Sequence, residues 1–469
     1  MKRIHSLCLN RIASLCLNRI AETCWARRWR LGGVLALFLA VLVASLRGEA
    51  QTPRTLGPDL TVRQALDIAL VNSTILREAQ ASLEQSSGEY EQARSVLLPQ
   101  FGFAARQGYL TANLQGLGID LPGFQNTLGP SGSMDARVFV SQDLLNIASL
   151  RSWKSYRSRQ DASRLLVDNA REVVTLNVVG AYLQALNAKA SRATLTEQTR
   201  LATDLYQITA ARSAQGVASE LDANRAKQQV NSLQQQLEEA EHSYVAARLN
   251  LANLLQAGIT SDFDVSDQAA YGTGATVDRQ ATLQAALATR ADHRAAQAAV
   301  RAAELEIKSI QATRLPTIKL RADDGQSGTT PTDNVNVYSV FGSITVPLFT
   351  SGRIAGQVHQ AQGTLAEART ALDQNRSQIE TDVLAAISGV EWALKQVQTS
   401  VENVGLSRQE VDLTRARFVQ GIADNTEVVN AQDRLSKAND ARIRAQYTLG
   451  LARANLARAV GGAEQAYRK

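Results

Sequence analysis

The chain is poor in the residues that build metal, redox and catalytic sites. Its three cysteines (Cys8, Cys16 and Cys24) all lie within the first 24 residues. The rest of the chain therefore offers no disulfide bond and no thiolate ligand for a metal. Three histidines follow residue 50, none spaced to share a metal with a second ligand type, and no glycine-rich phosphate loop is present. We expect no catalytic residue, no cofactor-binding residue and no metal ligand, and hence no enzyme.

An excess of positive charge is also missing from most of the chain, although the sequence pI is near 9.3. Residues 1–50 hold eight Lys and Arg residues against two acidic residues. Removing these from the totals of 50 basic and 44 acidic residues leaves 42 of each. This balance excludes a nucleic-acid-binding surface as the reason for the high pI.

Residues 1–50 are expected to be a long basic signal peptide. Arg27, Arg28 and Arg30 precede an apolar run at 31–46, and 48–50 supply small residues at the −3 and −1 positions of a cleavage site. The alternative is an uncleaved membrane anchor, for which the run is short. "SLCLNRIA" occurs twice in succession from residue 6, which indicates a tandem duplication or a start codon assigned too early.

Proline is absent from residues 131–315 and 348–469. Both stretches are rich in good helix formers, so they can support very long helices. Apolar residues recur there at steps of three and four, at Val230, Leu233, Leu237, Ala240, Tyr244, Ala247, Leu251 and Leu254. This spacing is typical of a coiled-coil seam, and an ordinary antiparallel bundle is the alternative.

The apolar period changes to two in the short regions where the prolines gather. We expect four strands, at about 99–110, 134–144, 316–325 and 335–348. A glycine-rich loop near 111–133 joins the first pair, and a shorter loop, "DDGQSGTTPTDN", joins the second. The chain is therefore expected to be mainly α-helical with a small β part.

The chain is also a tandem duplication. An Ala-Arg pair, two further residues, Gln-Gly, Val or Ile, and Ala begin at Ala211 and again at Ala416, 205 residues later. Leu70, Gln80 and Pro99 recur 217 residues later at Leu287, Gln297 and Pro316. We predict a first repeat at 51–278 and a second at 279–469, each ordered helix, strand, strand, long helix, tip and helix.

Helix lengths imply a rod with the strands at one end and the tip at the other. The helix at about 145–212 has roughly 68 residues, or about 100 Å, and those at about 61–98 and 219–256 are about 57 Å each. Four strands cannot close a barrel, and open edges are not left exposed. Several chains must therefore pool their strands.

This arrangement resembles the TolC family of bacterial outer membrane efflux proteins over essentially the whole chain after residue 50. The resemblance rests on "LTVRQALDIALVNSTILREAQ" from Leu60, "LLPQF" from Leu97, "VPLFTSG" from Val346 and the two glycine-containing tips. Pro347, Leu348, Phe349 and Gly352 match the family's strand-to-helix junction, whereas the first-copy counterpart, "QDLLNIA", is degraded.

The resemblance implies a homotrimer in outer membrane lipid, with most of the chain in the periplasm. Its strands would form one 12-stranded transmembrane β-barrel that continues into an α-helical barrel. This would be an exit duct for efflux or secretion of small molecules, or of proteins. The duct would work with a periplasmic adaptor and an inner membrane transporter, and would bind no nucleic acid. Aromatic candidates for the membrane girdle are Phe101, Phe103, Tyr109, Phe139, Tyr338 and Phe341.

The resemblance also gives the tips a role. The residues that match the family's periplasmic turns, which contact the adaptor and form the constricted entrance, are Gly216, Val217, Ala218, Gly421, Ile422 and Ala423. Asp222 and Glu427 match the acidic position after each turn. A structural alternative is open for both acids, because Ser219-x-x-Asp222 and Asp424-x-x-Glu427 resemble helix capping boxes after an ordinary glycine cap.

The gate departs from the family pattern. Members with a charge-latched entrance carry an Arg two residues after the second tip glycine and a Tyr three before it. This chain has Ala423 and Phe418 there, and Asn430 replaces a second acid. We therefore expect a gate without that latch, closed mainly by helix packing around Phe418.

The main rival is an exported coiled-coil adaptor or scaffold that forms no channel. Adaptors usually have one helical hairpin flanked by extended β domains. This chain has two helix-rich copies with only short strand pairs, which favours the duct.

Overall fold

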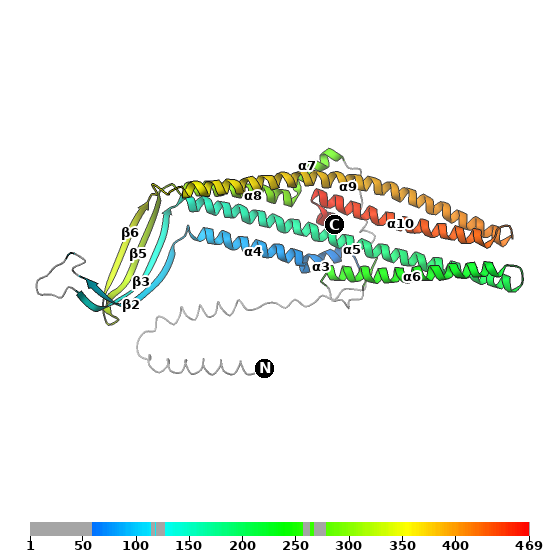
Figure 1. The fold of residues 1–469 in the computed structure, drawn as a ribbon, viewed down its shortest axis with the longest axis horizontal. Coiled ribbons are helices and arrows are strands. Elements are labelled where there is room, and N and C mark those ends of the chain that lie inside the picture. Colours follow the sequence, from blue (N-terminus) through cyan, green and yellow to red (C-terminus); the bar gives the residue numbers. More distant parts are fainter. Residues whose placement is uncertain (1–58, 114–117, 119–126, 257–262, 267–277, 469) are drawn as a thin grey trace, which may run out of the picture. The chain divides into compact units, whose positions relative to one another are not determined.

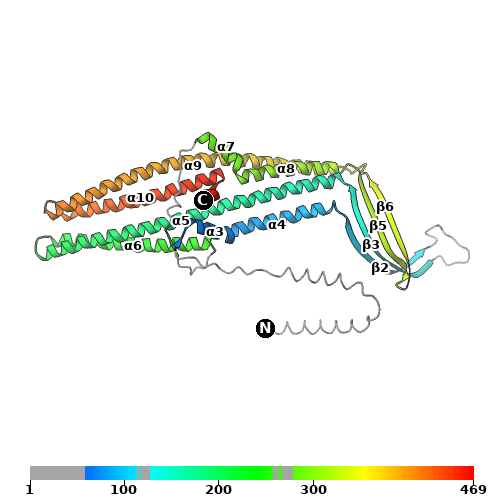
Figure 2. The same ribbon diagram turned by 180° about the vertical axis from the view of Figure 1, so that it is seen from behind.

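The computed structural model describes residues 59–113, 118, 127–256, 263–266 and 278–468. The expected signal peptide lies outside these residues. Within residues 59–468, the four long strands lie at one end of the helices and the two helical hairpin turns lie at the other (Figures 1 and 2). None of the helices described combines the length and hydrophobicity needed to span a bilayer.

The order helix, strand, strand, long helix, helix occurs twice, which confirms the predicted fold class. The first copy comprises α3 (Val62–Asn72), α4 (Thr74–Ser95), β2 (Gln100–Asn113), β3 (Thr127–Leu145), α5 (Ile147–Ala214) and α6 (Glu220–Leu254). The second comprises α7 (Arg279–Thr289), α8 (Ala291–Ala312), β5 (Thr317–Thr330), β6 (Asp333–Thr345), α9 (Arg353–Val419) and α10 (Asn425–Val460). A short α11 (Ala463–Arg468) follows, and β1 (Asp59–Leu60) pairs in parallel with β4 (Asp264–Val265).

The helix expected at 61–98 is in fact two helices, which corrects the prediction. The break falls at Ser73 (φ −55°, ψ 130°), and its counterpart 217 residues later is Arg290 (φ −59°, ψ 126°). No proline or glycine marks either position. Instead a side chain just before each break binds the end of a distant helix. Asn72 Nδ2 donates to the Leu255 carbonyl at 3.3 Å, and Thr289 Oγ1 to the Val460 carbonyl at 2.6 Å.

The second strand connection is also tighter than expected. Most of the stretch expected to be a loop is paired strand, and β5 and β6 stay paired to Thr330 and Asp333, with one irregularity between Gly328 and Thr330. The turn is held by the Asp333 N–H, which donates to Thr330 Oγ1 at 3.1 Å, and by Asn334 Nδ2, which donates to the Pro331 carbonyl at 2.7 Å. Backbone pairing between strands does not require apolar side chains. The polar ends of β5 and β6 therefore show no alternating apolar pattern from which they could be predicted.

Sheet and helices share one lateral order. The antiparallel sheet runs β2, β3, β5, β6. In the helical half beside it, α4 packs on α5, α5 on α8 and α8 on α9 (Figures 1 and 2). In the half towards the tips, the order is α6, α5, α10, α9. One edge of the protomer is therefore made by β2, α4 and α6, and the other by β6 and α9.

The largest hydrophobic core lies where α3, α5 and α6 meet the small β1–β4 pair. Tyr182 is fully buried there, and its hydroxyl donates to the Leu60 carbonyl at 2.6 Å. Burial disfavours the charge on Asp264. Hydrogen bonds from Lys189, from the Tyr244 hydroxyl and from the backbone nevertheless hold the pKa of this carboxyl at about 2. The first seam predicted from the sequence is part of this arrangement, since Tyr244 and Leu251 on it are buried.

Gly461 tests how closely the end of α10 approaches the break between α7 and α8. It has φ 80°, and a Cβ would lie 3.1 Å from the Arg290 Cα. We expect Gly461→Ala to lower the unfolding free energy by about 1–2 kcal/mol for the left-handed backbone. Crowding should add about 1 kcal/mol or more. The matched control is Gly421→Ala, because Gly421 has φ 74° but open space around it. Guanidinium unfolding in detergent, followed by circular dichroism, measures both, and equal losses would contradict the predicted crowding.

Candidate functional site

The first helical hairpin turns at Gly216, between α5 and α6. Gly216 has φ 74°, which glycine adopts without the strain that a Cβ brings. The Val217 N–H donates to the Arg212 carbonyl and the Gly216 N–H to the Ser213 carbonyl, both at 2.9 Å. These bonds form a Schellman cap, which satisfies carbonyls that the end of α5 would otherwise leave unpaired.

The second hairpin turns at Gly421 with the same geometry. Gly421 also has φ 74°, the Ile422 N–H donates to the Arg417 carbonyl at 2.9 Å, and the Gly421 N–H donates to the Phe418 carbonyl at 3.1 Å. A Cβ on either tip glycine would meet no atom within 4 Å. The glycines are therefore required by the backbone conformation and not by packing.

Each tip presents one apolar side chain outward. Val217 is 74% exposed and Ile422 is 64% exposed, whereas Ala218 is half-buried and Ala423 is buried. In many Schellman caps the residue after the glycine packs on the helix end. Here the facing helix positions are arginines, so the apolar residue remains available to another surface.

The caps expected at the start of α6 and α10 are half formed. Ser219 Oγ accepts from the Leu221 N–H at 3.1 Å, and Asp424 Oδ1 accepts from the Glu427 N–H at 2.8 Å. Among the hydrogen bonds of the described residues, neither Asp222 nor Glu427 completes its box. Their carboxylates face arginines instead: Asp222 lies 4.0 Å from Arg225 and Glu427 lies 3.4 Å from Arg417.

Several contacts connect the two hairpins near their tips, including a hydrogen bond from Arg212 Nη1 to the Phe418 carbonyl at 3.5 Å. The Arg212 guanidinium lies over the Phe418 ring, 4.9 Å from its centroid. Asn425, which is 2% exposed, donates from Nδ2 to the Asp222 carbonyl at 2.9 Å. Arg225 Nη1 donates to Thr426 Oγ1 at 3.1 Å.

Phe418 therefore lies at the contact between the hairpins. Arg212, Arg225 and Asn425 were missed by sequence reasoning. Only Arg212 carried a signal, because the repeated Ala-Arg pair begins both tip motifs.

The strand-to-helix junction of the second copy is an exposed seven-residue connector, 346–352. Leu348 is 94% exposed and Phe349 is 86% exposed, beside Pro347. Gly352 is the N-cap of α9 with φ 82°. In the first copy Asn146 alone joins β3 to α5, accepting from the Ser149 N–H at 2.9 Å. The two junctions match in sequence position but not in structure.

The sheet has one apolar face and one polar face. Residues opposite one another in the register share a face. The apolar face carries residues that are 57–82% exposed, namely Phe101, Phe103, Tyr109, Val138, Tyr338, Val340 and Ile344. Asp324 is the acidic exception on this face, and accepts from Asn336 Nδ2 at 3.2 Å.

The polar face carries the ion pairs and two of the six girdle candidates. Phe139 and Phe341 lie there, because their strand positions are odd while the apolar residues of β3 and β6 occupy even positions. The alternation corrects the expectation for this pair. Phe101, Phe103 and Tyr109 on β2, and Tyr338 on β6, remain on the apolar face.

Comparison with known proteins identifies the family of the chain. The outer membrane efflux protein family matches residues 65–257 and 282–462. The chain belongs to the outer membrane efflux protein family. It is 28% identical over 421 residues to the pyoverdine export outer membrane protein OpmQ of Pseudomonas putida, which covers 86% of both chains. It is 21% identical to the outer membrane protein TolC of Escherichia coli, covering 85% of this chain and 81% of TolC.

Solved structures show the same fold. The CmeC outer membrane channel of Campylobacter jejuni superposes with a TM-score of 0.75 at 18% identity, covering 89% of this chain and 91% of CmeC. The efflux protein is thus an outer membrane exit duct and not an enzyme. Members of the family are trimeric and work within tripartite efflux systems.

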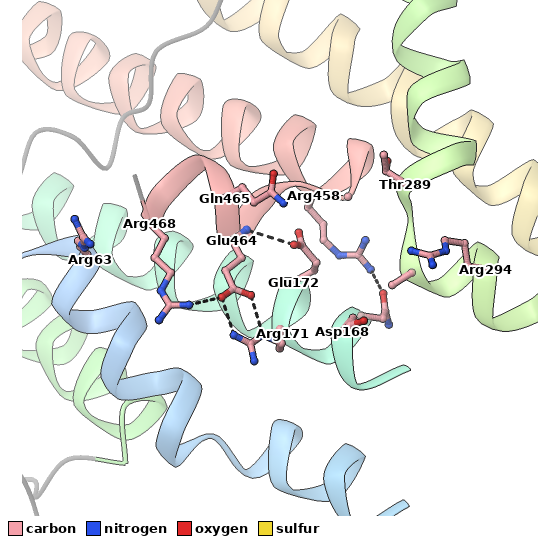
Figure 3. A pocket seen from close by; sticks show the side chains of 13 residues that line it. Arg63, Asp168, Arg171, Glu172, Thr289, Arg294, Arg458, Glu464, Gln465 and Arg468 are labelled. Carbon is pink, nitrogen blue, oxygen red and sulfur yellow. Dashed lines mark hydrogen bonds and ion pairs between the residues drawn. The ribbon is translucent and has the colours of Figure 1, made fainter. Parts of the chain in front are cut away.

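A cavity of about 620 Å³ lies away from the tips, where α11 meets α3, α5, α8 and the end of α10 (Figure 3). Two of its carboxylates, Glu172 and Glu464, take part in holding α11. Arg171 donates from Nε and Nη2 to both oxygens of Glu464 at 2.8 Å, which lowers the pKa of that carboxyl. Glu172 accepts the Ala463 N–H at 2.7 Å, although burial raises its pKa. The cavity wall thereby joins the two copies.

Glu464 allows a prediction about acid stability. Glu464→Gln should lower the unfolding free energy at pH 7 by about 1–2 kcal/mol. This value is at the low side for hydrogen bonds between charged groups, because the Arg171 side chain is still 37% exposed and solvent screens the pair. The folded pKa of Glu464 is depressed, so its contribution is present above about pH 4.5 and lost as the pH falls through the folded pKa. The difference between variant and wild type should therefore shrink in acid.

The matched control is Glu197→Gln. Arg200 binds Glu197 through the same two-bond geometry, but at an exposed site. We expect no measurable change in stability for this variant. Denaturant titrations at pH 7 and below pH 4 measure both, and a Glu464→Gln effect independent of pH would contradict the assignment.

Proposed function

We propose that three copies of this chain form one continuous duct. The main support is that the strands and the helices follow one another in the same order across the protomer. This order leaves an open edge on each side of every protomer. Joining β6 of one copy to β2 of the next would close twelve strands and pair every strand edge. The same rotation would bring α9 against α4 and α6 of the neighbour. Exposed apolar residues on α9, such as Trp392, Leu406 and Leu413, support this contact.

The apolar sheet face supports a barrel in outer membrane lipid. Large apolar and aromatic side chains on one face meet lipid, while ion pairs on the other face line a water-filled interior. The exposed Leu348 and Phe349 lie between the end of β6 and the start of α9. We propose that this junction sits at the inner surface of the membrane, where the barrel continues into the helical tunnel.

The two tips would contact a periplasmic adaptor, which couples the duct to an inner membrane transporter. Gly216, Val217 and Ala218 form one contact, and Gly421, Ile422 and Ala423 the other. Support comes from the exposed apolar side chain that each tip presents, next to polar turn residues. An apolar anchor with a polar surround is the usual make-up of an interface centre.

The cargo class would be small molecules, and transfer would involve no chemistry and no cofactor. The relative named for pyoverdine export matches over 86% of both chains, which supports this reading. Within the chain we propose repeats at 51–278 and 279–469 after a signal peptide at 1–50. The two segments matched by the family, 65–257 and 282–462, fall inside these limits.

The duct is tested by imaging and by conductance. Mature protein extracted in detergent should give three-fold end views in negative-stain electron microscopy. Side views should show a tube on the order of 140 Å long, from the helix lengths plus a barrel. The same preparation should conduct ions in planar bilayers. Monomeric rods obtained without detergent would overturn the duct in favour of an adaptor or scaffold.

Phe418 should hold the entrance closed. Phe418→Ala removes the ring beneath Arg212, and both residues are half-buried. Such a contact is worth about 0.5–2 kcal/mol. Each protomer of the trimer has this contact between its two hairpins, so the substitution loosens the entrance at three places. We therefore expect a several-fold rise in resting conductance in planar bilayers. Tyr206→Ala is the matched control, since Lys227 lies over that ring at 5.2 Å within a single hairpin. An unchanged conductance in Phe418→Ala, or an equal rise in Tyr206→Ala, would count against this role of the contact.

Asp222 and Glu427 are proposed to line the same entrance and to attract cations. Arg417 offsets part of the Glu427 charge at 3.4 Å, so the effect should be moderate. Glu427→Gln should shift the reversal potential in a KCl gradient towards anions. Glu410→Gln serves as control, because Glu410 is paired with Arg434 further from the tip of the same hairpin. The proposal fails if Glu427→Gln keeps the wild-type potential, or if Glu410→Gln shifts it equally.

A further inference from the structure

The polar face of the sheet holds four cations with different surroundings. They are Arg106 on β2, Arg137 on β3, and Lys319 and Arg321 on β5. The inference below rests on the proposed duct, in which this face lines the lumen. Each of these residues would then occur once per protomer, giving three copies at one height in the barrel.

Arg137 is occupied by the protein itself. Its guanidinium lies 2.8 Å from Asp135 and 2.9 Å from Asp323, and the Asp323 side chain is only 9% exposed. Asp323 also accepts from the Ser339 hydroxyl at 2.6 Å. Lys319 lies 4.0 Å from Asp143. These cations are neutralised within the sheet and have little charge left for a passing solute.

Arg321 is held in another way. Its guanidinium lies over the Phe139 ring, 5.1 Å from the centroid, and Phe341 is directly opposite it in the register. Among the described residues, no carboxylate lies within ion-pair distance of Arg321. An aromatic face fixes the plane of a guanidinium and leaves the N–H donors at its edge free.

Gly102 makes this arrangement possible. It lies opposite Phe139 in the register, and a Cβ at this position would overlap the Phe139 ring. The ring therefore lies against the β2 backbone and provides a fixed base for Arg321. An exposed arginine normally loses side-chain entropy when it binds a ligand, and a stacked one has already lost part of it.

We propose that Arg321 is an anion-binding residue of the lumen, and that the trimer presents three of them as a ring for carboxylate or phosphate groups of the cargo. The free edge of a guanidinium matches the two oxygens of such a group and binds them through paired N–H bonds. Arg106 has the same charge on the same face but no aromatic base and no ion-pair partner among the described residues. It is therefore the internal control.

Planar-bilayer recordings of the mature trimer test the ring, with citrate and inorganic pyrophosphate as separate probes. Either anion should reduce the KCl current in a saturable way. Arg321→Gln should weaken this block about tenfold or more, because a bidentate charge-assisted contact is lost. Arg321→Lys should recover it only partly, since an ammonium lacks the planar fork. Phe139→Leu should weaken the block while keeping the charge, and Arg106→Gln should change it by less than about threefold.

The outcomes separate this site from the duct. Absence of any conductance in wild type would contradict the proposed function. Normal conductance with no block by either anion would overturn the Arg321 ring alone. Equal effects of Arg321→Gln and Arg106→Gln would also overturn it, because the block would then follow only the total charge. If one probe blocks and the other does not, the ring selects carboxylate or phosphate accordingly.

Discussion

Strands β2 and β6 each leave one row of backbone N–H and C=O groups unpaired within the described sheet. In lipid such groups have no solvent partner, and each would cost several kcal/mol. The helices end in the same two edges, because α4 and α6 lie on the β2 side of the protomer and α9 lies on the β6 side. A heterologous contact that satisfies the strands must therefore also pair the helices. One rotation of the protomer has to suit a sheet, a helical wall and two hairpin tips at once.

Duplication explains how one chain meets this constraint. Each copy supplies two strands of the sheet, one long helix and three shorter helices beside it, so both copies contribute similar lengths of wall. The copies then diverge where the wall needs asymmetry. Arg212 and Arg417 are equivalent by the 205-residue spacing, yet Arg212 lies over Phe418 of the other hairpin, while Arg417 faces Glu427 of its own. This difference lets Arg212 contribute to the link between the hairpins, while Arg417 is held within its own.

Features with a strong local cause could be predicted from the sequence. The absence of proline over 131–315 and 348–469 predicted helices as long as α5 and α9. Glycine in each tip motif predicted a helix cap, and the structure places Gly216 and Gly421 in the left-handed region. The helix breaks at Ser73 and Arg290 could not be found this way. They depend on Asn72 and Thr289 binding helix ends about 170 or more residues away. The face of Phe139 was missed for a similar reason, since strand parity needs the register. At the tips, Asn425 and Arg225 act only through contacts between the two hairpins.

The partner that holds an arginine decides what that arginine can still do. Arg171, Arg290 and Arg137 are bound by carboxylates, which fixes their position and cancels their charge. They hold α11, the α7–α8 break and the sheet. Arg212 and Arg321 instead lie over aromatic rings, at the tip and in the sheet. A ring fixes a guanidinium without cancelling its charge, although one edge donor of Arg212 is used by the Phe418 carbonyl. Rings are not confined to the ends of the proposed duct, since Arg248 lies over Tyr244 and Phe263 beside the main core. A carboxylate cancels the charge of the arginine that it holds, whereas the ring beneath Arg321 leaves that charge available to a solute in the proposed duct.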